Sequence, residues 1–359
     1  MIQQLLIKAG RNILDLIRDG GFDWDRITAY YGSASGPRWL ITSGFDLTLL
    51  NQGCLGRTRS VLLAGASSGA WRFAAWLQPD PAKSYETLRQ AYIETEYRRG
   101  ETPQSIQQSL IDIINRYIED DALPFALANR THRLAVITAR AKKLVASETP
   151  WIQKTGLGLC FAGNFFYPET LYGFFERIVF YSGPKPPAFC LNGTFRGRHL
   201  PLNRFNFKHA VLSSGAIPLV VAGVRDIFGA PRGVYRDGGL VDYHINESFS
   251  HEPGDITLFF HHQEYSRPTW MDKNLKYRRT PSPLMDNVLM IHPTPEFVVT
   301  LPDSKIPDRT DFVTYIDDHP RRIRNWQQAV DQSAHLGEVF LELVESGRIR
   351  NAVLPLEPL

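Results

Sequence analysis

A serine between two glycines is the residue whose surroundings point most directly to chemistry. Ser67 stands in Gly65-Ala66-Ser67-Ser68-Gly69, after the apolar run Ser60 to Ala64 and before apolar residues with helical spacing. In a strand, sharp turn and helix of this kind, the glycines permit a cramped corner that exposes the hydroxyl, and the first helical amides face it as oxyanion donors. The pattern predicts a nucleophilic Ser67, and a small-residue crossover without chemistry is the alternative.

A serine hydroxyl is a weak nucleophile near neutral pH and needs a base within hydrogen-bonding reach. Two assignments stay open. In the first, Asp237 of Asp237-Gly238-Gly239 takes the proton directly, and the glycines allow its close approach; the alternative for this sequence is a tight turn. In the second, Ser67 is followed by Asp237 or Asp242 and then by His261 or His262, which is the chain order of an α/β-hydrolase triad.

A loop of small residues precedes the serine corner. Gly32-Ser33-Ala34-Ser35-Gly36-Pro37-Arg38 follows the β-branched and aromatic run Ile27 to Tyr31. Its backbone amides can cradle an anion, but its glycines fit neither the dinucleotide fingerprint nor the P-loop. With a serine nucleophile on the next strand, the loop is predicted to form the oxyanion hole. Pro37 has no amide hydrogen, so the amides of Ser35 and Gly36 are favoured.

The remaining apolar patterns indicate elements that alternate along the chain. Buried strands are predicted at Leu134 to Ala139 and Ile256 to Phe260, and a strand passing into a small-residue turn at His209 to Val221. Residues 79–121 are predicted to be covering helices, and Arg321 to Gly347 one helix with Gly347 as its C-cap. Such alternation predicts an α/β domain with a mainly parallel sheet, in which ligands gather at strand ends.

Composition limits the class of protein. The 359 residues carry 40 basic and 37 acidic side chains, a net charge of +3, which argues against a nucleic-acid binder. Three cysteines without metal-type spacing, and no calcium loop, lead us to expect neither a metal nor a cofactor. Residues 1–21 are predicted to form a helix packed on the domain; they lack a signal-peptide core, and no run is long enough to span a bilayer. A cytoplasmic protein is expected.

One region differs in composition from the rest. Residues 151–208 hold 14 aromatic side chains and seven Lys or Arg against two Glu, a local charge of +5. We interpret them as an aromatic and basic insertion within a single domain of residues 1–359, with residues 264–359 as a C-terminal extension that ends in a helix. Such a surface suits acyl chains or peripheral contact with an anionic membrane, and an insertion with its own core is the alternative.

Taken together, the loop at 32–38, the serine corner at 65–69, Ser213 to Val221 and the Asp-Gly-Gly at 237–239 resemble the patatin-like phospholipases. The resemblance spans roughly residues 27–245. It implies a three-layer α/β/α fold and a Ser–Asp dyad without histidine, with Ser67 as nucleophile and Asp237 as base. It also implies that Gly36 and Arg38 end the oxyanion loop. The loop departs from the family pattern, because Ala34 and Ser35 stand where its first two glycines would align.

The sequence therefore predicts a serine acyl-ester hydrolase that acts on a lipid or another acyl ester through an acyl-enzyme intermediate. Two alternatives stay open. One is an esterase with a triad that uses His261 or His262, and the other is an inactive lipid-binding protein on the same scaffold. The head group, the acyl length and the oligomeric state are not predicted.

Overall fold

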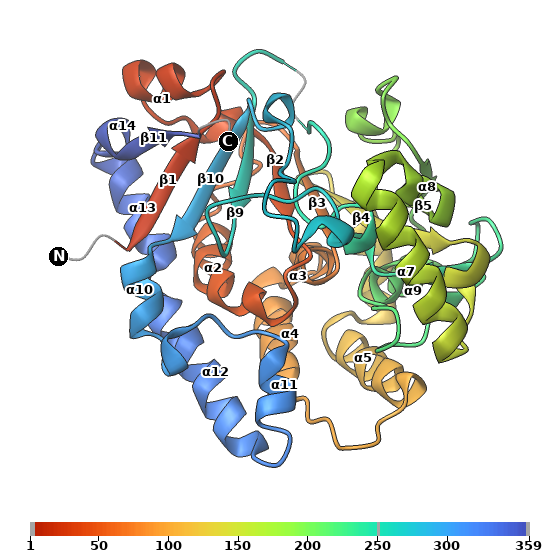
Figure 1. Ribbon diagram of the computed structural model, residues 1–359. Helices are drawn as coiled ribbons and strands as arrows, with labels where there is room; N and C mark the ends of the chain where they lie inside the picture. Colours follow the sequence, from red (N-terminus) through yellow and green to blue (C-terminus); the bar gives the residue numbers. More distant parts are fainter. Residues whose placement is uncertain (1–3, 250–251, 357–359) are drawn as a thin grey trace.

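A mixed β-sheet runs through the centre of the computed structural model, which describes residues 4–249 and 252–356 (Figure 1). Within these residues the sheet has 11 strands in the order β11-β1-β10-β9-β2-β3-β4-β5-β6, and β8 pairs with β4 and β7. Strands β10, β9, β2, β3 and β4 run parallel. The strands are β1 (Leu5–Ala9), β2 (Ile27–Gly32), β3 (Val61–Ala66), β4 (His132–Ala141), β5 (Phe175–Tyr181), β6 (Arg198–Pro201), β7 (Val224–Arg225), β8 (Val234–Arg236), β9 (Ile256–Phe260), β10 (Val288–Pro293) and β11 (Val353–Pro355).

Two hydrophobic cores lie on opposite faces of this sheet. Successive residues of β2 show the division, because Tyr30 belongs to one core and Tyr31 to the other, as the alternation of a strand requires. The helices are α1 (Leu14–Gly20), α2 (Ser43–Asn51), α3 (Ser68–Trp76), α4 (Pro81–Glu94), α5 (Pro103–Tyr117), α6 (Leu123–Ala128), α7 (Pro150–Phe166), α8 (Leu171–Phe174), α9 (Phe207–Ser214), α10 (Pro295–Thr300), α11 (Thr310–Thr314), α12 (His319–Ser333), α13 (Leu336–Glu345) and α14 (Ile349–Ala352).

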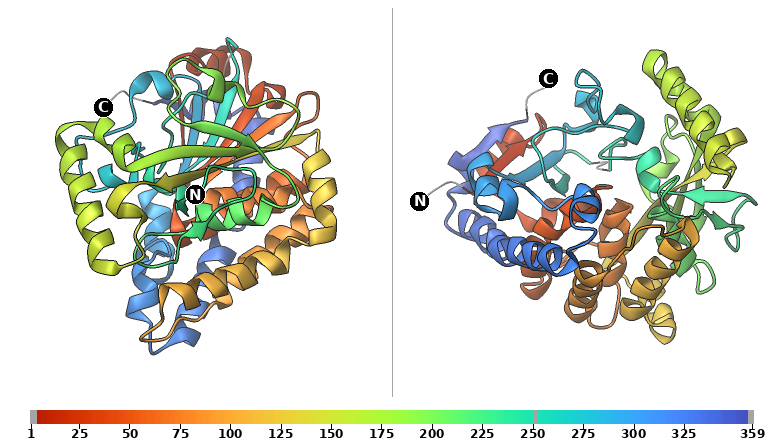
Figure 2. Two further views of the ribbon diagram at one scale, coloured as in Figure 1. Left: turned by 90° about the vertical axis from the view of Figure 1, so that its right-hand side faces the viewer. Right: turned by 60° about the horizontal axis from the view of Figure 1, so that its bottom comes forward.

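The helices divide between the two cores. Helices α2, α3, α4, α5, α9, α12 and α13 contribute to the first core, and α7 and α8 to the second. The right-hand view of Figure 2 shows the blue C-terminal helices and the yellow-green α7 on opposite sides of the molecule. The α/β class with helices on both faces of a largely parallel central sheet is therefore confirmed.

A buried ion pair fixes the helix that follows the serine corner. Asp46 of α2 and Arg72 of α3 are paired in the interior, and the hydroxyls of Tyr30 and Tyr85 donate to the two carboxylate oxygens of Asp46, each at 2.6 Å. Removing one partner would leave an uncompensated buried charge. The network therefore fixes α3 against α2, α4 and β2, and with it the direction of the first turn of α3.

The start of the chain differs from its prediction. Residues 1–3 of the predicted helix lie outside the described part, and the next residues form β1, in which Leu5, Ile7 and Ala9 are buried and alternate with less buried neighbours. Helix α1 begins only at Leu14. The single helix predicted over residues 1–21 is therefore wrong. The apolar residues of this segment fit the spacing of a helix and also that of a strand. Antiparallel pairing with β10 stabilises the strand.

Two further predicted elements are wrong in type or extent. The stretch beginning at His209 is helical, because it lies in α9, and the small-residue turn follows at Gly215; a short apolar run does not distinguish a strand from a buried helix. The predicted C-terminal helix is two helices, α12 and α13, which are separated at residues 334–335. Gly347 follows α13 with φ +70°, as expected of a helix end. The strands predicted after Ser60, at 134–139 and at 256–260 are confirmed as β3, β4 and β9, and residues 79–121 contain α4 and α5 as expected.

The aromatic segment and the C-terminal third both contribute to the central sheet. Strands β5 and β6, from residues 151–208, extend it beyond β4, and β10 and β11 extend it beyond β9. The described chain ends in β11 rather than in a helix. Among residues 4–249 and 252–356, no helix combines the length and the apolar character that crossing a bilayer requires.

Candidate active site

Ser67 occupies a strained corner between β3 and α3. Its backbone has φ +54° and ψ −126°, a conformation that residues with a side chain seldom adopt. The end of β2 packs so closely on α3 that a Cβ on Gly69 would lie 2.0 Å from the carbonyl oxygen of Gly32. A Cβ on Gly65 would lie 2.6 Å from the amide nitrogen of Ala70. The Gly-x-Ser-x-Gly sequence therefore forms the strand, corner and helix that were predicted.

The hydroxyl of Ser67 donates a hydrogen bond to Oδ2 of Asp237 at 2.8 Å. The two residues are 170 positions apart in sequence. The sheet brings them together, because Asp237 follows β8, β8 pairs with β4, and β4 is the neighbour of β3. Both side chains are enclosed, with Ser67 4 % and Asp237 5 % exposed. Within residues 4–249 and 252–356, no third group stands between the hydroxyl and the carboxylate.

Asp237 is held from three directions. Its Oδ1 accepts from the amide of Gly239 at 2.7 Å, and its own amide donates to the carbonyl of Ala216 at 2.9 Å. A Cβ on Gly238 would lie 2.0 Å from the carbonyl oxygen of Ile137, so this approach needs glycine. Burial raises the pKa of the Asp237 carboxyl, while the nearby Arg309 charge and the hydrogen bond from Ser67 oppose the rise. A carboxylate with a raised pKa accepts a proton more readily than an exposed one.

Ser214 supports the corner, and the sequence did not single out this role. Its hydroxyl accepts from the amide of Ser67 at 2.8 Å and donates to the carbonyl of Ile137 at 2.7 Å. Ser214 ends α9 and is fully buried. The sequence motif at Ser213 to Val221 does not reveal this contact, and only the fold shows that one of its serines fixes the backbone of Ser67.

The loop at 32–38 lies beside Ser67 as predicted, but one expected donor is engaged. The amide of Ser35 donates to Oγ of Ser68 at 3.2 Å, and the two hydroxyls are 3.1 Å apart. Gly36, with φ +57°, faces the cavity at Ser67, and its amide and that of Ser68 have no hydrogen-bond partner among the described residues. The amides of Gly36 and Ser68, rather than that of Ser35, are therefore the ones open to donate to an oxyanion. Arg38 lies at a different cavity, 3.8 Å from Asp308.

A largely apolar cavity of about 420 Å³ opens at Ser67. It is bounded by Gly36 and Trp39 at the end of the small-residue loop, by α4 and α5, by the turn after α9 and by α11. Pockets lined mainly by apolar side chains with a few polar groups are typical sites for small ligands. Its apolar lining is formed by Trp39, Trp71, Leu88, Tyr92, Tyr97, Ile106, Leu110, Ile217, Val220, Val221, Phe312, Val313 and Ile316.

The two histidines considered for a triad do not reach the serine. Among the described residues, neither His261 nor His262 hydrogen-bonds Ser67 or Asp237. Nδ1 of His261 instead lies 3.5 Å from the hydroxyl of Ser33. Asp242, the other carboxylate considered, is paired with the buried Arg177 at 2.6 Å. The structure therefore lacks the arrangement that a triad requires, in which a histidine stands between the serine and the carboxylate.

His244, His261 and His262 have ring nitrogens within 4.8 Å of one another, a spacing that raises the question of a metal ion. Nδ1 of His244 accepts a hydrogen bond from the amide of Arg267 at 2.8 Å. In a neutral imidazole the hydrogen then resides on Nε2, which leaves that nitrogen no lone pair for a metal. Burial lowers the pKa of all three imidazoles, which does not oppose metal binding, so it is the His244 tautomer that argues against a metal ion. In this arrangement the three side chains do not fit a metal ion.

Arg309 is a second residue at the site whose place the sequence did not predict. It lines the cavity at Ser67, and its Nε would lie 2.9 Å from a Cβ on Gly36, so its side chain rests against the oxyanion loop. It belongs to a polar stretch of the C-terminal third that carries no recognisable motif, and only the fold places it beside residues more than 200 positions earlier. No signal in the sequence would have found it.

Compared with known proteins, the chain matches no protein-family model and no curated protein sequence. The functional argument therefore depends on the geometry of the site.

Proposed function

We propose that the protein is a serine acyl-ester hydrolase of patatin-like type, in which Ser67 and Asp237 form a catalytic dyad. The observation that carries the proposal is the direct 2.8 Å hydrogen bond from Ser67 to Asp237 at a strained corner. Free amides lie beside this hydroxyl, and an apolar cavity opens in front of it. Strained backbone persists where the surrounding structure enforces it, and such places are often functional.

In the proposed reaction, Oγ of Ser67 bonds to the carbonyl carbon of the ester while Oδ2 of Asp237 takes the hydroxyl hydrogen. The amides of Gly36 and Ser68 stabilise the negative oxygen that forms. When the intermediate collapses, the bond to the leaving oxygen breaks and the alcohol leaves with the proton from Asp237. Water then attacks the acyl-enzyme, Asp237 accepts its proton, and the acid is released as Ser67 regains its hydrogen.

The experiment is a hydrolysis screen over p-nitrophenyl esters of increasing acyl length and a set of phospholipids. It compares the wild type with Ser67→Ala and Asp237→Asn. Ser60→Ala is the matched control, because Ser60 is an exposed serine just before the same strand. We expect turnover that requires Ser67 and Asp237 and is unaffected in the control. Equal rates in wild type and Ser67→Ala would refute the proposal, and a folded protein without any turnover would favour the inactive lipid-binding protein.

A second proposal concerns the surface around α7, which we propose contacts anionic membranes at the periphery. Several large apolar side chains are exposed on and just after this helix, and Lys154 accompanies them. Apolar side chains with basic neighbours bind anionic bilayers. Flotation with neutral and anionic vesicles tests this: equal binding to both would refute it. The exposed residues are Trp151, Leu159, Phe161, Phe165, Phe166 and Tyr167.

A further inference from the structure

A second cavity, of about 350 Å³, is lined by other residues of the loop at 32–38 than the apolar cavity is. The loop residues Ala34, Ser35 and Arg38 form part of its wall. A small hollow lined by Asp237 shares Ile217 with the apolar cavity and Tyr243 with the second cavity. The two cavities therefore approach each other beside Asp237, and Arg309 lines both of them.

The charge of the second cavity, which we call the polar cavity, is strongly positive. Arg38, Arg267, Lys273 and Arg309 line it against a single acid, Asp308. That acid is already shared between Arg38 at 3.8 Å and Lys305 at 3.2 Å. In the described part of the chain, Arg267, Lys273 and Arg309 have no acidic partner. Burial lowers the pKa of the Lys273 amine, and the charges of Arg309 and Arg38 lower it further, as expected of cations that repel one another.

Arg309 occupies the point where the cavities meet. It lines the apolar cavity, the polar cavity and the small hollow between them. Its guanidinium rests against Gly36, and its charge lowers the pKa of the Asp237 carboxyl. A guanidinium offers several donors in a planar fork that suits carboxylate and phosphate oxygens.

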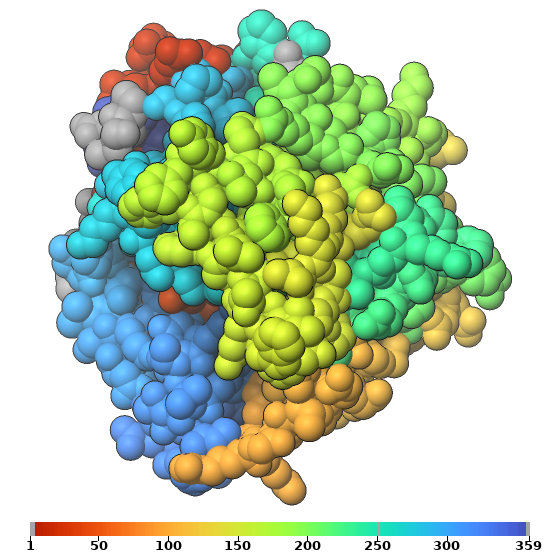
Figure 3. Space-filling view, turned by 45° about the vertical axis from the view of Figure 1, so that its right-hand side comes forward, coloured from red at the N-terminus to blue at the C-terminus, as the bar shows by residue number. Residues whose placement is uncertain are grey.

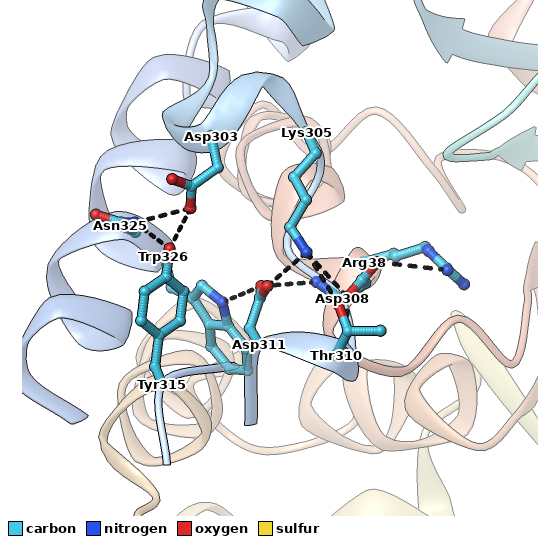
Figure 4. A network of polar contacts seen from close by, with 9 residues as sticks. All are labelled: Arg38, Asp303, Lys305, Asp308, Thr310, Asp311, Tyr315, Asn325 and Trp326. Atoms are coloured by element: carbon cyan, nitrogen blue, oxygen red, sulfur yellow. Dashed lines mark hydrogen bonds and ion pairs between the residues drawn. The ribbon is translucent and has the colours of Figure 1, made fainter. Parts of the chain in front are cut away.

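The chain on both sides of Arg309 is fixed by hydrogen bonds and ion pairs (Figure 4). Asp308 accepts from the amide and the hydroxyl of Thr310 at 2.8 and 2.6 Å, and its own amide donates to Asp311 at 3.0 Å. Asp311 in turn accepts from the ring nitrogen of Trp326 at 2.8 Å and pairs with Lys305 at 2.5 Å. A side chain held at a fixed backbone binds a ligand with a smaller loss of conformational entropy.

The polar cavity is large enough to take a charged group and stands near the surface. Figure 3 shows a hollow where the blue C-terminal segment, the cyan segment and the yellow-green α7 meet. We infer that the polar cavity is an anion subsite, and that the preferred substrate is an acyl ester whose leaving group carries a carboxylate or a phosphate held by Arg309 together with Arg38 and Lys273. This inference rests on the proposed hydrolase function. The acyl chain then lies in the apolar cavity and the anionic leaving group in the polar one.

The test compares two matched esters, para-octanoyloxybenzoate and its neutral methyl ester, in wild type, Arg309→Met and Arg309→Lys. A third ester, para-octanoyloxyphenyl phosphate, shows which of the two anions is preferred. Arg324→Met is the control, because Arg324 is an exposed arginine of α12 that lines neither cavity. We expect the ratio of kcat/KM for anionic over neutral ester to fall about tenfold to a hundredfold in Arg309→Met. In Arg309→Lys this ratio should fall less than in Arg309→Met, and in Arg324→Met it should equal that of the wild type.

A ratio that does not change in Arg309→Met, or one that falls equally in Arg324→Met, would overturn the inference. So would a wild type that prefers the neutral ester. A general loss of folding would lower both rates together and would leave the ratio unchanged, so the ratio separates recognition from stability.

A binding measurement separates this inference from the proposed function. Calorimetry with the Ser67→Ala protein and para-octanoyloxybenzoate reports the subsite without turnover. Its Kd should rise about tenfold or more when Arg309→Met is added, and the rise should shrink with added salt because the contact is ionic. If the anion binds in a way that depends on Arg309 but the wild type hydrolyses no ester, the proposed hydrolase function is contradicted and the anion subsite is not. If the wild type hydrolyses esters but the anion does not bind through Arg309, the anion subsite is contradicted and the hydrolase function is not.

Discussion

Two buried polar groups lie at the strand ends of this sheet, and they differ in what surrounds them. Ser67 and Asp237 are in direct contact, next to free amides and an open apolar cavity. His244, His261 and His262 are also close together, but their rings meet one another edge-on or tilted, and His244 and His261 stack on Tyr243 and Phe259. Residue type alone would make the histidines the better bases. The comparison shows that a side chain can serve as a base for Ser67 only if it contacts the Ser67 hydroxyl beside an open cavity, whatever its residue type.

Replacing the carboxylate of Asp237 should reduce turnover more than any other substitution considered. Asp237→Asn keeps the shape of the side chain but cannot accept the serine proton. We expect kcat for a p-nitrophenyl ester to fall about a thousandfold, with little change in the thermal midpoint. Steady-state kinetics together with a melting curve measures both. A loss of less than about tenfold would mean that another group serves as the base.

Breaking the ion pair beneath α3 should destabilise the whole serine corner. Arg72→Met leaves Asp46 charged in the interior, with the hydroxyls of Tyr30 and Tyr85 as its remaining hydrogen-bond donors among the described residues. Denaturant titration should show a loss of about 3–5 kcal/mol in the free energy of unfolding. Arg116→Met, an exposed position of α5, is the control and should stay within about 0.5 kcal/mol of wild type. An equal loss in both variants would contradict the role given to the buried pair.

Removing the support for the nucleophile's backbone should have a moderate effect. Ser214→Ala leaves the amide of Ser67 without its 2.8 Å partner. We expect kcat to fall about tenfold, which corresponds to one lost hydrogen bond. Ser213→Ala removes the neighbouring buried hydroxyl, which bonds only within α9, and serves as the matched control. Equal rates in the two variants would remove Ser214 from the account.

The pH dependence should follow the ionisation of Asp237. In the proposed mechanism the ionised carboxylate is the base, so kcat/KM should fall as pH falls through the pKa of this group. Burial raises that pKa, so the acid limb should lie above the ordinary range of an aspartate. Arg309→Met removes a charge that lowers the pKa and should move the limb to still higher pH. A pH–rate profile of the neutral ester measures the shift, and a limb that moves to lower pH would contradict the placement of Arg309.

Replacing the histidines should have the smallest effect on turnover. His261→Gln and His262→Gln remove the imidazoles of the triad hypothesis, and neither ring contacts the dyad. We expect rates within about threefold of wild type, since no catalytic proton transfer is lost. Rates are normalised to the folded fraction from circular dichroism, because His261 is buried. A loss comparable to that of Asp237→Asn would restore the triad.

Much of the site was visible in the sequence because its parts are local. The glycines around Ser67 and after Asp237 lie so close to neighbouring atoms that no side chain would fit. Because each glycine is within two residues of the functional side chain, the motif can be recognised in the sequence. The strands at 134–139 and 256–260 are buried on both faces and therefore read as continuous apolar runs. For the same reason the α/β class could be predicted without a structure.

Other features depend on contacts between distant segments, and the sequence could not show them. Strand β1 exists because β10 lies beside it, although its residues also fit a helix. The amide of Ser35 is engaged by the side chain of Ser68, which lies on the next strand-to-helix corner. Arg309 contacts Gly36 although the two residues are far apart in the sequence. Such preferences are set by tertiary packing rather than by local pattern.

The most direct test of the central claim is covalent labelling with a fluorophosphonate, which reacts only with an activated serine hydroxyl. Mass spectrometry of the digested protein should place the adduct on Ser67, and the rate of labelling should fall sharply in Asp237→Asn but not in His262→Gln. An adduct on another residue, or labelling that is as fast in Asp237→Asn as in wild type, would contradict the dyad.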